Sequence, residues 1–445
     1  MVNMMKLNPK KTIFLMTIMA IFCLILSACS GKTKAKKPTV NPTELFQSAL
    51  LTATYGMPTA SPIPGTATPE PPTATPLPTA TVPRTPPALP ATFQTEFLNS
   101  LDTPHTYVQD TCQYLRNKWD PNNSAPGTVL MPIMFHGIAA NEAAKANDIT
   151  HGQLEELLNN LKSQGFEAIN MQQAADFMTR NAKIPNRSVL LIVDDRHNKE
   201  YYLTNFESKL KEYNWPLINA WISLPDSITT TALPGNIELS QAGWVDYQAH
   251  GVVHNTPISE WPDGTNIDTS GIPAWADILR TVSEFPAGTF YNADQLNGSS
   301  LTTEGYVHME LGGARALIEK NFGKAPVAYI WPGGGFSSLA VRVAGEVGYT
   351  LGFTINPRGP VMYNWVPLLD ETDPSRPSYM PEGKVGNPLM VLPRYWDTDA
   401  SYNIDNVRQI GKQAAAAAEA SKQVEIDYYD IVCSPTLGPL PAAAQ

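Results

Sequence analysis

The stretch 188–195 reads SVLLIVDD, an apolar run that ends in two aspartates. A second apolar run, VLMPIMF, covers Val129–Phe135. Runs of this length are typical of strands that are buried on both faces of a parallel sheet. Two acids directly after a buried strand either bind something or form a turn that caps a helix. From this stretch alone, both interpretations stay open.

Further strands and helices alternate after these two runs. We expect strands at Leu217–Ile222, Val327–Trp331, Tyr349–Ile355 and Leu389–Leu392, and helices at Gly152–Gln164, Phe206–Tyr213, Ala314–Asn321, Leu339–Val347 and Val407–Ala420. Such alternation predicts an α/β domain with a parallel sheet or barrel. The stretch Asn255–Thr303 is rich in Pro, Gly, Asp and Trp and breaks the pattern, so we expect an insertion at about 255–303.

The N-terminus has the features of an export signal. Three lysines among the first eleven residues precede the apolar stretch Ile13–Leu26, which is followed by LSAC up to Cys29. The apolar stretch is shorter than the roughly 20 residues that a transmembrane helix needs. LSAC is similar to the bacterial lipobox, so we expect a lipoprotein signal peptide at 1–28 and a lipid anchor on Cys29. An uncleaved anchor is the alternative, and both place the chain outside the cytoplasm, in the bacterial cell envelope.

A linker and an extension precede the predicted domain. Residues 29–95 contain the basic stretch Lys32–Lys37 and a Pro/Thr/Ala-rich segment, which accounts for much of the total of 40 Pro. This composition cannot form a core and favours an extended stalk. We expect a lipid-anchored linker at 29–95, an N-terminal extension at 96–128 and one domain at 129–435.

Charge and cysteine content limit the functional classes. The net charge is -10, so nothing suggests binding to nucleic acid, and a neutral or cationic substrate fits better than a polyanion. Cys112 and Cys433 lie near the two ends of the predicted folded part. In an exported protein they could form a disulfide, and two buried free thiols are the alternative.

Two further segments follow or end predicted strands. The first reads HGVVH at His250–His254, and two histidines four residues apart can bind the same metal ion. Gly251 stands where zinc proteases of the H-E-x-x-H type have their Glu. The second reads WPGGG at 331–335, and its simplest interpretation is a turn.

Taken together and in this order, these motifs resemble the polysaccharide deacetylase family with the NodB homology domain (carbohydrate esterase family 4). The resemblance covers roughly Val129–Ala420 and implies a NodB-like distorted (β/α) barrel of about seven parallel strands. PIMFH at 132–136 and the segment Leu339–Tyr349 are similar to the secreted poly-N-acetylglucosamine deacetylase branch.

The resemblance also implies roles for individual residues. Asp194 corresponds to the general base, and Asp195, His250 and His254 correspond to the ligands of a divalent metal. Zinc is the first expectation for this metal, and cobalt, nickel and manganese are alternatives. The wall of the substrate groove corresponds to Trp331, Pro332, Gly333 and Gly334.

The sequence departs from the family pattern at three places. Arg196 replaces a Gly, Gly251 replaces a Ser or Thr, and the late L-x-H motif that supplies the acid is missing. Arg394 lies in the region of that motif and is expected to orient Asp194 or bind substrate, unless it forms a surface ion pair. We assign the acid to His136, as the branch permits; a purely structural His is the alternative.

The leading hypothesis is a metal-dependent hydrolase that removes N-acetyl groups from N-acetylglucosamine-type units of a cell-wall or exported polysaccharide. One alternative is a non-catalytic carbohydrate-binding lipoprotein of the same fold, and another is a glycoside hydrolase. The expected partners are an N-acetylated polysaccharide and the membrane. Aromatic residues that could stack on sugars are Trp331, Trp221, Trp261 and Tyr247.

Overall fold

The computed structural model describes residues 84–99, 102–143, 145, 147–224, 226–254, 303–355, 358–369 and 386–443. The chain divides into two units, Met1–Thr81 and Val82–Gln445, and everything described lies in the second. The signal peptide, Cys29, most of the linker, Trp261 and residues 255–302 of the expected insertion lie outside the described residues and remain predictions. Among the helices of the described part, none is long and apolar enough to cross a membrane.

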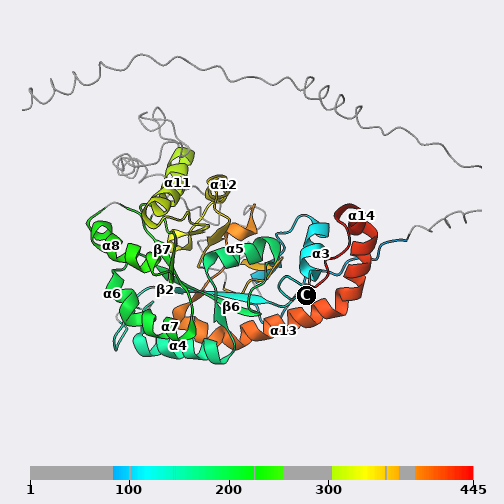
Figure 1. Cartoon of the computed structure of the whole chain (residues 1–445), viewed down its shortest axis with the longest axis horizontal. Helices are drawn as coiled ribbons and strands as arrows, with labels where there is room; N and C mark the ends of the chain where they lie inside the picture. The colour runs from blue at the N-terminus through cyan, green and yellow to red at the C-terminus, as the bar shows by residue number, and fades with distance from the viewer. Residues whose placement is uncertain are drawn as a thin grey trace, which may run out of the picture. The chain divides into compact units, whose positions relative to one another are not determined.

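A parallel sheet forms the centre of the second unit (Figure 1). In spatial order its strands are β10 (Leu351–Phe353), β9 (Ala328–Ile330), β8 (Val245–Ala249), β7 (Leu217–Trp221), β6 (Arg187–Asp194), β2 (Val129–Phe135) and β12 (Tyr395–Trp396). The short β5 (Glu167–Ala168) also pairs with β6. Every residue of β2 is buried, and so is all of β6 after its first residue. The two apolar runs therefore form two neighbouring inner strands of the sheet, as their composition predicts.

The two edges of this sheet are connected to each other. Leu392 forms a parallel bridge with Phe353 of β10, and its N–H donates to the carbonyl of Gly352 at 2.8 Å. Three residues later, Tyr395–Trp396 pairs with β2 at the other edge. The segment from Leu392 to Trp396 thus curls the sheet into the distorted (β/α) barrel that we expected.

The prediction of a strand at Leu389–Leu392 is wrong. Pro388–Met390 forms a short 3-10 helix (η4), in which Pro388 is the first residue and the Asn387 side chain accepts the N–H of Leu389. Proline has no N–H for a sheet and has a fixed φ that suits the first turn of a helix. Only Leu392 at the end of this stretch pairs with a strand.

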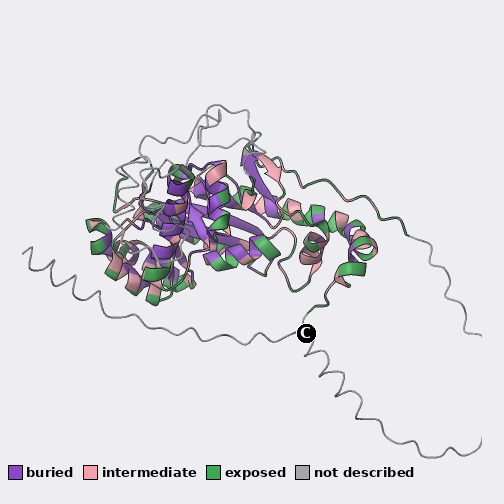
Figure 2. Ribbon diagram, turned by 90° about the horizontal axis from the view of Figure 1, so that it is seen from above, coloured by how far each residue is buried: buried purple, intermediate pink, exposed green. Residues whose placement is uncertain are grey.

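Helices cover the sheet and turn their apolar sides toward it. They are α4 (His151–Ser163), α5 (Met171–Arg180), α6 (Lys199–Tyr202), η1 (Leu203–Glu207), α7 (Ser208–Tyr213), α8 (Ser227–Gln241), α11 (Thr303–Phe322), α12 (Ser338–Glu346) and α13 (Asp397–Tyr428). Figure 2 shows the buried residues concentrated in the strands and on one side of the helices. The expected helix Ala314–Asn321 is the second half of α11, and Val407–Ala420 is the middle of α13, which passes along α4 in Figure 1.

The N-terminal extension and the C-terminus pack together. In the N-terminal extension, β1 (Asp102–His105) pairs antiparallel with β11 (Val366–Leu369). Elsewhere, the two-residue strands β3 (Ile138–Ala139) and β4 (Ile149–Thr150) form a separate parallel pair. α3 (Thr111–Trp119) is joined to η5 (Tyr429–Cys433), just before α14 (Ser434–Leu437), by a disulfide between Cys112 and Cys433. The structure thus adopts the disulfide alternative for the two cysteines.

Candidate active site

The end of β6 separates the two aspartates in space. Asp194 is the last residue of β6 and is buried, whereas the side chain of Asp195 is 44% exposed. Asp195 has φ of +70°, a conformation that Asp and Asn tolerate better than most residues. The Asn219 side chain of β7 donates to the carbonyls of Val193 at 3.1 Å and Asp195 at 3.0 Å. These two hydrogen bonds fix the backbone of the turn. In this turn the Asp194 carboxylate is buried and the Asp195 carboxylate reaches solvent.

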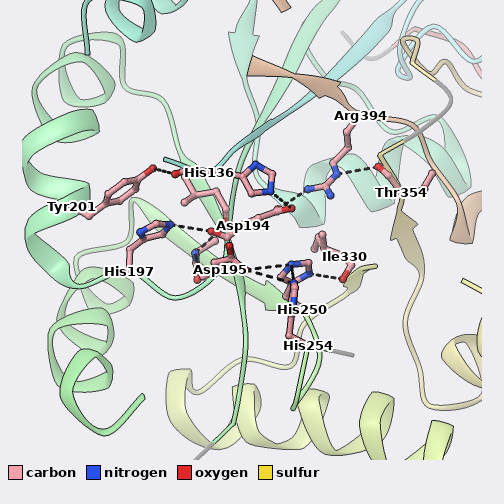
Figure 3. Close-up of polar contacts among 12 residues, drawn as sticks. His136, Asp194, Asp195, His197, Tyr201, His250, His254, Ile330, Thr354 and Arg394 are labelled. Atoms are coloured by element: carbon pink, nitrogen blue, oxygen red, sulfur yellow. Dashed lines mark hydrogen bonds and ion pairs between the residues drawn. The ribbon is translucent and has the colours of Figure 1, made fainter. Parts of the chain in front are cut away.

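Asp195, His250 and His254 converge on one point (Figure 3). Their ligand atoms all lie within 4.8 Å of one another. The Nε2 atoms of the two histidines are 3.1 Å apart, and Asp195 Oδ1 lies 3.9 Å from His250 Nε2 and 3.6 Å from His254 Nε2. Ligand atoms at about 2.0–2.1 Å from a tetrahedral zinc ion are about 3.4 Å apart, so the spacing of this donor set fits a zinc-like ion.

The surroundings of His250 prepare its Nε2 as a ligand. Its Nδ1 lies 2.8 Å from the carbonyl of Ile330 at the end of β9, and a proton on Nδ1 leaves a lone pair on Nε2. Burial lowers the pKa of His250 to about 4, against the opposing effect of Asp194. The ring is therefore neutral around pH 7, as metal binding requires.

Asp194 is held by a buried ion pair. Arg394, which is fully buried, donates from Nη1 to Asp194 Oδ1 at 2.6 Å and from Nε to the carbonyl of Thr354 at 3.1 Å. Burial acts to raise the pKa of Asp194, but Arg394, His250 and His136 outweigh it and lower this pKa to about 2. Asp194 thus stays ionised at neutral pH. Of the roles expected for Arg394, the structure excludes the surface ion pair and shows the contact with Asp194.

His136 lies on the other side of Asp194, directly after β2. Its Nε2 is 3.7 Å from Asp194 Oδ2, and 28% of its side chain is exposed. Its ring stacks on Trp396 at 5.2 Å between centroids, and its carbonyl accepts the hydroxyl of Tyr201 at 2.6 Å. This geometry fits a proton donor that is partly exposed to solvent and is held in place by Trp396 and Tyr201.

Asp397 supports His136 from the start of α13. It is buried, accepts backbone N–H groups of Thr398 and His136, and burial raises its pKa to about 7. Among the described residues, His136 Nδ1 and Asp397 Oδ2 are both buried polar atoms without a hydrogen-bond partner. We did not select Asp397 from the sequence, although it directly follows strand β12, as Asp195 follows β6. Tyr201 and Asn219 gave no sequence signal.

Three of the four expected aromatic platforms, Trp331, Trp221 and Tyr247, are buried, which contradicts a sugar-stacking role for them. Trp331 is fully buried, and its indole N–H donates to the carbonyl of Met390 at 2.6 Å. Trp221 and Tyr247 are also buried and pack edge to face against each other. These rings belong to the core because they lie in, or directly after, strands whose residues are almost all buried.

The Gly-rich turn after β9 does bring exposed backbone to this end of the sheet. Pro332–Gly334 forms a 3-10 turn in which Pro332 and Gly334 are buried and Gly333 is exposed. Gly334 has φ of +74°, and a Cβ there would collide with the side chain of Ile355. Of the four residues expected to form the groove wall, Gly333 is therefore the one that solvent reaches.

Arg196 contacts the start of α8 and not the candidate metal ligands. Its Nη1 donates to Asp226 at 2.7 Å and to the hydroxyl of Thr229 at 2.8 Å, at the start of α8. The replacement of Gly by Arg at this position therefore anchors a helix and leaves the ligand set intact. The neighbouring His197 contacts the carbonyl of Asp194 through Nε2 at 3.1 Å.

Comparisons with known proteins give matches in structure. No family model and no curated protein matches the sequence. The structure is similar to the Streptococcus pyogenes deacetylase PplD in complex with acetate, with 16% identity over 64% of this chain and 99% of that one, at a TM-score of 0.43. It is also similar to a de-N-acetylase from Aggregatibacter actinomycetemcomitans (16% identity, 60% and 94% coverage, TM-score 0.40) and to IcaB from Ammonifex degensii (12% identity, 64% and 98% coverage, TM-score 0.41). The function of this chain is therefore inferred from its own residues.

Proposed function

We propose that this chain is a metal-dependent hydrolase that removes N-acetyl groups from N-acetylglucosamine-type units of a cell-wall or exported polysaccharide. One observation carries the proposal. Three metal-ligand atoms within 4.8 Å of one another stand beside a buried, ionised Asp194, with His136 on its far side. A ligand set, a base and an acid at one sheet edge are the parts that amide hydrolysis requires.

Asp195, His250 and His254 would hold the ion. Three protein ligands leave at least one position open on a tetrahedral metal, which is typical of catalytic sites and not of structural ones. When bound, a zinc-like ion polarises a carbonyl oxygen and lowers the pKa of water to about 7. Because Asp195 and His254 are 44% and 40% exposed, the open side of the site faces solvent.

The other residues move the protons. Asp194 accepts a proton from the attacking water, and Arg394 keeps this carboxylate ionised and in place. His136 donates a proton to the nitrogen of the departing sugar amine as the amide C–N bond breaks. Acetate and a free amino sugar are the products.

The N-terminal sequence supports a proposal on location. We infer that the chain is a lipoprotein of the cell envelope, anchored through Cys29, with the linker between the membrane and the domain. Metabolic labelling with a radioactive fatty acid tests this proposal. Labelling of the wild-type chain and loss of label in Cys29→Ser are expected, and equal labelling of both would contradict the proposal.

Acetate release from N-acetylglucosamine oligomers tests the enzymatic proposal. The purified full chain, loaded with zinc, is compared with Asp194→Asn and with Asp176→Asn, whose carboxylate pairs with Arg180 on the surface of α5. Loss of the base should lower the rate by roughly 10²–10⁴, and the surface control should keep it. If the zinc-loaded wild type releases no acetate from several N-acetylated glycans but binds them, the non-catalytic carbohydrate-binding alternative holds. New reducing ends without acetate would favour a glycoside hydrolase.

A further inference from the structure

The loop that carries His254 has buried backbone N–H groups that need acceptors. Gly251 and His254 have φ of +88° and +51°, so the loop after β8 is a tight turn. Val252 and Val253 between them are buried. Buried backbone N–H groups are almost always hydrogen-bonded, because leaving them unpaired destabilises the fold.

The Glu310 carboxylate supplies these acceptors from another part of the chain. Its Oε1 accepts the N–H of Val252 at 2.8 Å and that of Val253 at 3.0 Å, and its Oε2 lies 3.3 Å from the latter. Glu310 belongs to α11 and is fully buried. A buried carboxylate is unfavourable unless it is hydrogen-bonded, so its place against this loop needs a reason.

Gly251 and Glu310 fit each other. A Cβ at position 251 would lie 2.5 Å from Glu310 Oε1, closer than a carbon atom can approach. The family that the motif resembles has Ser or Thr at this position. In this chain the side chain is missing, and the carboxylate of Glu310 occupies the adjacent space.

The two histidines of the site are fixed by different means. His250 is anchored through its backbone N–H to the carbonyl of Trp221 at 3.0 Å and through its ring to the carbonyl of Ile330. The His254 ring is 40% exposed, and the one hydrogen bond described for it is to His250. The position of His254 therefore depends on the backbone of its loop.

We propose that Glu310 is a positioning residue for the metal site, which fixes the Gly251–His254 loop and so holds His254 in reach of the ion. The inference rests on the proposed function in one respect, because it takes Asp195, His250 and His254 as metal ligands. It predicts that Glu310 changes metal affinity without contacting the metal. Residues that support metal ligands in this way typically change affinity by about 10- to 100-fold when they are replaced.

Zinc affinity of the purified full chain, measured by competition with a chromophoric chelator, tests this inference. Glu310→Gln keeps the shape but replaces one acceptor oxygen by an NH₂ group that cannot accept, and Glu310→Asp keeps the charge but shortens the reach. Both should raise the zinc Kd by about tenfold or more. The visible spectrum of the Co²⁺-loaded protein should change as well, since it reports the arrangement of the ligands.

Glu425→Gln is the matched control. Glu425 is also a buried glutamate, and it accepts from Lys118 and Trp119 at 2.8 Å each, on α13. This variant should lose stability but keep the wild-type zinc Kd and Co²⁺ spectrum. Circular dichroism identifies which variants fold. The zinc Kd of either folded Glu310 variant is then enough to test whether Glu310 positions His254.

The outcomes separate this inference from the proposed function. Folded Glu310 variants with wild-type zinc Kd and Co²⁺ spectrum would overturn the positioning role, even if the wild type releases acetate. A wild type that binds zinc but releases no acetate would overturn the proposed function, while weaker binding in the Glu310 variants would still support the role of Glu310. A wild type that binds no zinc would contradict both.

Discussion

Replacing Arg394 by methionine should destabilise the protein in a pH-dependent way. Arg394 contributes most to holding the pKa of Asp194 at about 2 instead of the ordinary 3.8. A pKa difference of nearly two units corresponds to about 2.5 kcal/mol of stability. Because the folded pKa is the lower one, this stability is present above pH 3.8 and is lost as pH falls through about 2.

Without Arg394, burial is opposed only by the weaker effects of His250 and His136 on Asp194. Burial then raises its pKa above the ordinary value, so the ionised carboxylate opposes folding at neutral pH. Breaking a buried ion pair from one side typically costs about 3–5 kcal/mol, which we expect for Arg394→Met at pH 7. At pH 4 the variant can protonate Asp194, and the loss should be roughly half as large.

Urea unfolding of the metal-stripped chain at pH 7 and pH 4 measures both values. Arg408→Met is the control, because Arg408 is a partly exposed arginine of α13 whose ion pair is with Asp405, a largely exposed residue. The control should change the free energy of unfolding by less than about 1 kcal/mol at either pH. An Arg394→Met loss below that value at pH 7, or an equal loss at both pH values, would refute this account of Asp194.

Three further predictions concern His136, Asp397 and the disulfide. His136→Gln should lower kcat for acetate release by about 10²–10⁴ with little change in KM, and an unchanged kcat would remove His136 as the acid. Burial raises the folded pKa of Asp397 to about 7. The contribution of this group to the free energy of unfolding is therefore fully present below pH 3.8 and is lost as pH rises through about 7, by up to about 4 kcal/mol. In Asp397→Asn, urea unfolding should show a smaller fall between pH 4 and pH 8; an identical fall would contradict the burial argument. Replacing Cys112 and Cys433 by serine should lower the free energy of unfolding by roughly 2–5 kcal/mol and leave the zinc Kd unchanged, so a weaker zinc affinity would count against a purely structural disulfide.

Two inner strands of the sheet could be predicted from local sequence, and the candidate metal ligands from motifs that resemble a known family. Val129–Phe135 and Ser188–Val193 are apolar throughout, and such runs can only be buried strands or buried helices. Asp195 and His250 follow strands β6 and β8, and the carboxyl ends of parallel strands meet at one edge of the sheet. The position of Asp195 and His250 directly after two parallel strands was therefore enough to predict that they lie close together.

Other features depend on contacts between distant parts of the chain. The prediction of a strand at Leu389–Leu392 failed because Pro388 starts a 3-10 turn, so that only Leu392 pairs with a strand. Trp331 was expected to face a substrate, but whether an aromatic ring at a strand end is covered depends on the chain around Met390. Glu310 lies 58 residues from Val252 and has no motif of its own, so only the folded chain reveals their hydrogen bond.

Acetate release during re-addition of metal tests the central claim most directly. The full chain is stripped with a chelator, dialysed and assayed on N-acetylglucosamine oligomers while zinc is added back in measured amounts. If Asp195, His250 and His254 form one catalytic metal site, the stripped chain is inactive and activity rises in proportion to zinc until about one equivalent is bound. A stripped chain that releases acetate as fast as the zinc-loaded chain would contradict the metal-dependent hydrolase proposed for this protein.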